Sequence, residues 1–105
     1  MDSAMEFAID VPYDRLAEFA RKWRIVELSL FGSVVKPEEF RADSDVDVLV
    51  AFEKEAPWSL WDITEMKNEL EDMFGREVDI VERDAVRNPY VRRDIFDNRQ
   101  IVYAA

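Results

Sequence analysis

The sequence contains neither cysteine nor histidine. The lack of cysteine excludes disulfide bonds, thiol nucleophiles and thiolate zinc sites, and the lack of histidine removes the commonest general base and metal ligand. Any catalysis by this chain must therefore use carboxylates, hydroxyl groups, cationic side chains or a bound metal ion.

Glycine and proline are also scarce, with two and four residues in 105, and the sequence has no repeat and no Gly/Ser-rich linker. Because 49% of the residues are hydrophobic, we expect a real core and one domain spanning residues 1–105. No apolar run approaches the roughly 18 to 20 residues that span a bilayer, and the N-terminus is acidic where a secretory signal would be basic. We therefore expect a cytoplasmic protein with no membrane partner.

Positive charge is in deficit, since 24 acidic residues outnumber 14 basic ones and the formal net charge is -10. A surface of this sign repels long polyanions unless a local basic patch is focused. We therefore expect no direct nucleic-acid partner, and a basic protein or a hard cation fits better.

The spacing of apolar residues predicts alternating helices and strands. In chain order these are a helix over 12–23, a strand over 25–31, a strand over 46–52, a helix from a capping box at Ser59 to Gly75, a strand over 77–81, a helix over 88–97 and an extended edge segment over 99–103. The nearly continuous apolar run in 46–52 is typical of a strand covered on both faces. This order indicates an α/β or α+β fold, a small mixed β-sheet with flanking helices.

Two carboxylates, Asp45 and Asp47, stand at the start of that apolar strand. Side chains alternate along a strand, so both project to one side, with Cα atoms about 6.6 to 6.8 Å apart. Burying two bare carboxylates is costly and raises their pKa values, whereas a divalent cation offsets the repulsion. Magnesium is the natural candidate, because it favours one or two carboxylates plus waters and phosphates. Asp79 would be the third member if its strand pairs with 46–52.

Gly32 and Ser33 follow the strand over 25–31 and suggest the other half of such a site. Glycine lets the backbone approach a phosphate closely, and the following serine adds a hydroxyl group and its own N–H. Neither a Gly-Ser pair nor an Asp-x-Asp pair is specific alone. The joint order of strand, Gly-Ser, Asp-x-Asp and a later lone aspartate is specific.

Three segments resemble the minimal nucleotidyltransferase family of the polymerase-beta superfamily. They read F-G-S at 31–33, S-D-V-D-V-L-V at 44–50 and G-R-E-V-D-I-V at 75–81, and the resemblance covers roughly residues 12–103. The resemblance implies the nucleotidyltransferase, polymerase-beta-like fold. It also implies an enzyme that takes ATP or another nucleoside triphosphate and performs two-metal phosphoryl transfer with Mg²⁺.

The same resemblance assigns roles to single residues. It implies that Gly32 and Ser33 hold the triphosphate, that Asp45 and Asp47 bind two Mg²⁺ ions, and that Asp79 completes the site as ligand and base.

The sequence departs from the family pattern directly after Gly-Ser. Many members continue with Arg-Ala-Arg-Gly, whereas here the stretch is Val-Val-Lys-Pro over 34–37. Lys36 or Arg41 would have to supply the missing positive charge to the phosphates, and the sequence does not choose between them.

The resemblance further implies an antitoxin whose partner is a HEPN-domain toxin, to which it transfers AMP on a hydroxyl group. One alternative is an inert antitoxin that neutralises a HEPN ribonuclease by direct binding. Transfer to a small-molecule hydroxyl is a lesser alternative, because such relatives usually add a second domain to hold the acceptor. In a homodimer, the second copy of the chain would supply the surface that holds the acceptor.

Overall fold

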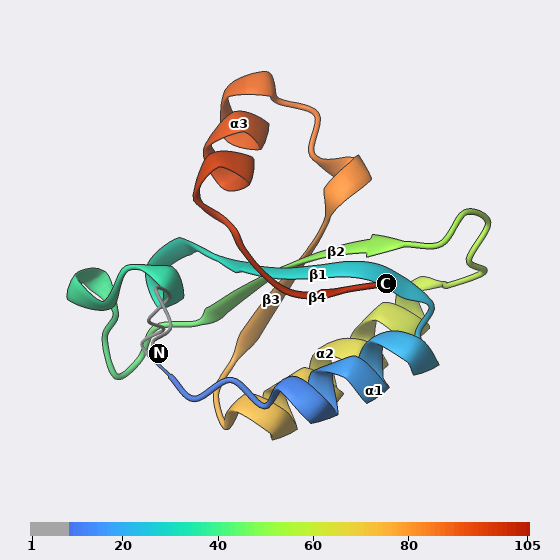
Figure 1. Cartoon of the computed structure of the whole chain (residues 1–105), viewed down its shortest axis with the longest axis horizontal. Helices are drawn as coiled ribbons and strands as arrows, with labels where there is room; N and C mark the ends of the chain where they lie inside the picture. The colour runs from blue at the N-terminus through green and yellow to red at the C-terminus, as the bar shows by residue number, and fades with distance from the viewer. Residues whose placement is uncertain (1–8) are drawn as a thin grey trace.

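The computed structural model describes residues 9–105, which form a four-stranded sheet with helices on both sides (Figure 1). The strands are β1 (Ile25–Phe31), β2 (Val46–Phe52), β3 (Val78–Glu82) and β4 (Gln100–Ala104). The helices are α1 (Tyr13–Lys22), α2 (Leu60–Phe74) and α3 (Pro89–Asn98), and the short 3-10 helices are η1 (Gly32–Val35), η2 (Pro37–Glu39) and η3 (Arg83–Ala85). The expected mixed sheet with flanking helices is confirmed.

The strand order is β3-β2-β1-β4. Strand β1 runs antiparallel to both β2 and β4, whereas β2 and β3 are parallel and are joined through α2. The apolar strand β2 therefore lies inside the sheet, as its composition predicts. Strand β4 lies at one edge, as expected for the segment over 99–103, and β3 lies at the other.

Alternate residues of β2 reach opposite faces of the sheet. Val46, Val48 and Val50 are buried in the core beneath α1 and α2, together with the apolar stripes of both helices. Figure 1 shows these two helices side by side on one side of the sheet and α3 on the other. Asp47 occupies the intervening position, so it projects toward the α3 side.

Local signals set the bounds of α2. The Ser59 side chain accepts a hydrogen bond from the backbone N–H of Asp62, and the Asp62 carboxylate accepts one from the backbone N–H of Ser59, which makes the expected capping box. Gly75 ends the helix in the left-handed region, with φ of 70°. Among residues 9–105, no helix combines the length and the apolar character needed to cross a membrane.

Candidate functional site

The end of β1 and the starts of β2 and β3 meet at one end of the sheet. Phe31 pairs with Asp47 in the antiparallel ladder, and Asp47 pairs with Asp79 in the parallel ladder. Asp45 precedes Asp47 by two residues at the entry to β2. The strand directions thus bring the residue before Gly32 and the two strand carboxylates together, although they are far apart in the sequence.

Gly32 lies directly against the carboxylate of Asp47. Its φ is +76°, in the region that side chains rarely adopt, and a Cβ atom built on it would collide with Oδ2 of Asp47. A glycine is therefore required here for two reasons, the backbone conformation and the space that the aspartate takes. Ser33 follows in η1 and is half-buried.

The pKa of Asp47 is raised from 3.8 to about 6. Burial is the largest cause, and the negative charges of Asp79 and then Asp45 add to it. Asp45 is half-buried, whereas Asp79 is exposed, because β3 is an edge strand. The apolar neighbours of Asp79 in the sequence, Val78 and Ile80, do not bury it, because alternate residues of a strand point to opposite faces.

Carboxylate oxygens are the ligands that magnesium prefers, and a cation would relieve the repulsion that raises the pKa of Asp47. The chemistry of the donor set therefore fits a hard divalent cation. In residues 9–105, however, no three carboxylates stand close enough together to form a metal site as placed. The three-carboxylate magnesium site predicted from the sequence stays a prediction.

A cavity of about 270 Å³ adjoins Gly32, between the end of β1 and α3. Lys36 lines this cavity, which places its side chain beside the same glycine. Arg41 does not line it and lies exposed on the loop that leads to β2. Geometry therefore distinguishes the two cations that the sequence leaves equivalent.

Sequence reasoning missed Arg76, which organises the entry to the site. Its guanidinium Nη1 donates to the backbone carbonyls of Arg41, Ala42 and Ser44, at 3.4, 3.4 and 3.0 Å. The same group lies 4.5 Å from the ring centre of Phe40. These contacts fix the loop before Asp45 to the segment before β3. Its only sequence signal is its place in the G-R-E-V-D-I-V run.

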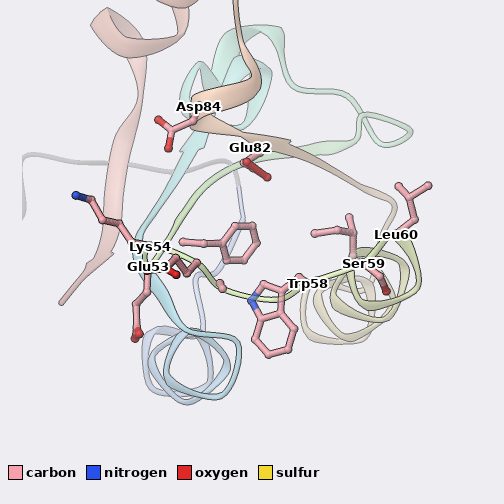
Figure 2. Close-up of a pocket in the computed structure, with 11 residues that line it drawn as sticks. Glu53, Lys54, Trp58, Ser59, Leu60, Glu82 and Asp84 are labelled. Atoms are coloured by element: carbon pink, nitrogen blue, oxygen red, sulfur yellow. The ribbon is translucent and has the colours of Figure 1, made fainter.

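A larger cavity, about 490 Å³, lies at the opposite end of β2 (Figure 2). Phe52, Trp58 and Ile63 form its apolar part, and Glu53 and Glu82 are among its carboxylates. No residue of the predicted site lines it. The larger hollow is thus not where the glycine and the aspartates meet.

Comparison with known proteins shows sequence relatives of this chain. The family model "Nucleotidyltransferase domain" matches residues 14–102. The chain is 35% identical over 86 residues to the protein adenylyltransferase MntA of Thermococcus cleftensis, covering 82% of this chain and 81% of that protein.

Solved structures with a similar fold include a toxin–antitoxin structure with AMP-PNP. The match has a TM-score of 0.71 at 15% identity and covers 90% of this chain and 75% of that one. Another is a tri-AMPylated HEPN toxin from Shewanella oneidensis in complex with its MNT antitoxin, with a TM-score of 0.62 at 14% identity and coverage of 89% and 70%. At these identities the structural matches show the shared fold.

Proposed function

Because the chain belongs to the nucleotidyltransferase domain family, we propose that it transfers AMP from ATP to a hydroxyl group of a HEPN-type toxin, with release of pyrophosphate, and thereby acts as an antitoxin. The observation that carries this proposal is the packing of Gly32 on the Asp47 carboxylate, with Asp79 paired beside it. The adenylyltransferase relative and the AMPylated HEPN toxin support the choice of nucleotide and partner.

In this proposal the end of β1 holds the triphosphate. Gly32 lets phosphate oxygens approach the backbone, and Ser33 offers its hydroxyl group and its N–H as donors. Lys36 supplies the positive charge, since it lines the cavity next to Gly32 and Arg41 does not.

The carboxylates act on the other side of the reacting phosphorus. Asp79 is exposed, so a hydroxyl group of a protein partner can reach it, and its carboxylate orients that hydroxyl and takes its proton. Asp45, Asp47 and Asp79 would hold magnesium, which stabilises negative charge on the phosphoryl oxygens when bound. Burial and, after it, the negative charges of Asp79 and Asp45 raise the pKa of Asp47, and a bound cation would offset both causes.

The test is transfer of label from α-³²P-ATP, in the presence of Mg²⁺, to a purified HEPN-type toxin. We expect the wild type to label the partner and Asp47→Asn to be slower by about 1,000-fold or more. Gly32→Ala should be similarly impaired, because its methyl group displaces the Asp47 carboxylate.

Asp72→Asn is the matched control, since Asp72 is an exposed carboxylate on α2, which covers the other side of the sheet from Asp47 (Figure 1). It should label the partner at the wild-type rate. If the wild type transfers no label, the enzymatic proposal is wrong; neutralisation of the toxin by Asp47→Asn as fully as by wild type would instead favour inhibition by contact.

A further inference from the structure

The cavity beside Gly32 has a second wall that the nucleotidyltransferase motifs do not include. Val91, Asp94, Ile95 and Asn98 line it from α3. Their spacing of three, four and seven residues places them on one stripe of the helix. One stripe of α3 therefore faces the cavity next to the predicted phosphate site.

The lining of the cavity combines two kinds of chemistry. Gly32 and Lys36 are suited to phosphate, whereas Phe31, Val91 and Ile95 provide apolar surface suited to a flat ring. Its volume, about 270 Å³, is just under the usual range of small-molecule pockets. That is room for a sugar and a base, with the phosphates next to Gly32 and Lys36.

Asp94 is the acidic member of this α3 wall. The side-chain amide of Asn98 donates to its Oδ1 at 3.2 Å and to its backbone carbonyl at 2.8 Å. An ionised carboxylate has about four acceptor positions and no donor, so this contact orients the group and leaves acceptors for a ligand. Asp94 is thus suited to a ligand that presents hydrogen-bond donors.

We propose that this cavity binds the nucleoside of the triphosphate, with Asp94 accepting hydrogen bonds from its donor groups. Ribose hydroxyl groups and the exocyclic amino group of the base share this chemistry. The inference rests on the proposed function, because that function locates the triphosphate at Gly32 and Lys36. The position of the nucleoside against α3 is inferred from the cavity.

The test measures binding of ATP and of inorganic tripolyphosphate, both with Mg²⁺, to the wild type and to Asp94→Ala. Loss of a hydrogen bond to a charged group should weaken ATP binding about ten- to a hundredfold and leave tripolyphosphate binding unchanged. Asp97→Ala removes an exposed carboxylate from the same helix that does not line the cavity, and it should bind both as the wild type does.

Two analogues identify the donor group. If Asp94 contacts the ribose, wild type should bind 2′,3′-dideoxy-ATP more weakly than ATP, and Asp94→Ala should bind the two equally. If Asp94 contacts the base, the wild type should bind purine riboside triphosphate, which lacks the amino group, more weakly than ATP. Asp94→Ala should then bind these two nucleotides equally. Equal wild-type affinity for ATP and both analogues would overturn the role of Asp94.

Val91→Trp provides a second test that does not depend on Asp94. Val91 is 49% exposed, so a larger side chain can be accommodated without disturbing the core while filling the cavity. It should bind ATP at least tenfold more weakly and tripolyphosphate normally. If both Asp94→Ala and Val91→Trp bind ATP as the wild type does, the nucleoside proposal is wrong and the proposed function stands. If the wild type binds neither probe, both fail.

Discussion

The two faces of the sheet use the same strand for different purposes. On the side of α1 and α2, Val46, Val48 and Val50 are at most 1% exposed, and the core around them is apolar. On the side of α3, the residues between them begin with Asp47, whose burial raises its pKa to about 6. Burial therefore stabilises the fold on the first face, whereas on the second face, which also buries Leu49, burial of Asp47 carries a cost.

Other polar groups on the α3 side show the same contrast. Glu27 contacts Arg99 at 3.3 Å and Arg83 at 4.0 Å, so its charge is balanced. Ser29 is fully buried, and within residues 9–105 its hydroxyl group has no hydrogen-bond partner. The face that carries the candidate site thus contains the one buried side-chain polar group without a hydrogen-bond partner in the described part of the chain.

The largest expected effect comes from giving the helical face the charge that the other face carries. Val48→Asp places a carboxylate at a fully buried core position, and should lower the free energy of unfolding by about 4 kcal/mol or more. Urea denaturation followed by circular dichroism measures this. Ile101→Asp, at a 44% exposed position on the edge strand, is the control and should cost less than about 1 kcal/mol. Equal costs for the two variants would contradict the division between the faces.

An intermediate and pH-dependent effect is expected at Asp47. Because its pKa is raised from 3.8 to about 6, the native state holds this proton more tightly than the unfolded state, so its stabilising contribution is complete below pH 3.8 and is lost as the pH rises through 6. Asparagine does not ionise, so Asp47→Asn does not lose unfolding free energy in this way as the pH rises. In metal-free buffer the variant should exceed the wild type in unfolding free energy by about 1 to 3 kcal/mol at pH 7.5, the range allowing for partial exposure.

The pH comparison has its own control. Denaturation of both proteins at pH 4 should give nearly equal stabilities, and Asp72→Asn should follow the wild type at both pH values. Added Mg²⁺ should stabilise the wild type and leave Asp47→Asn almost unchanged, which narrows the gap at pH 7.5. A difference that is the same at pH 4 and pH 7.5 would show that ionisation of Asp47 is not its cause.

The smallest effect is expected at Ser29. Ser29→Ala removes a buried hydroxyl group that forms no hydrogen bond within the described residues, so its unfolding free energy should stay within about 1 kcal/mol of the wild type or rise. Ser59→Ala removes the capping box of α2 instead, and should cost about 1 kcal/mol. Thermal unfolding of the two variants and of the wild type measures these differences in unfolding free energy. If Ser29→Ala proved the more damaging, the hydroxyl group must have a role that its surroundings do not reveal.

Local sequence signals predicted the elements well, because each depends on nearby residues. The capping box at Ser59 and the left-handed residue Gly75 set α2 correctly, and the apolar run over 46–52 identified an interior strand. Strand pairing is not local, so the contact of Asp79 with Asp47 could be stated only as a condition. The edge position of β3 follows from the same pairing, which is why the exposure of Asp79 was not foreseen.

The basic residues around the site also show that tertiary contacts cannot be predicted from local sequence. Lys36 and Arg41 are both basic residues within ten positions of Gly32, and only the position of α3 shows which of them adjoins the cavity. Arg76 stands in the G-R-E-V-D-I-V run, but the run does not indicate what the side chain contacts, because its partners are backbone carbonyls, which every residue offers. Roles of this kind depend on tertiary structure.

The contacts of Arg76 also matter to anyone who exchanges parts between members of this family. One guanidinium group holds the loop over 40–44, although more than thirty positions separate them in the chain. A loop transplanted alone would lose the group that shapes it, and a recipient without this arginine would present its first aspartate on an untethered segment. A chimera should therefore receive the loop together with Arg76.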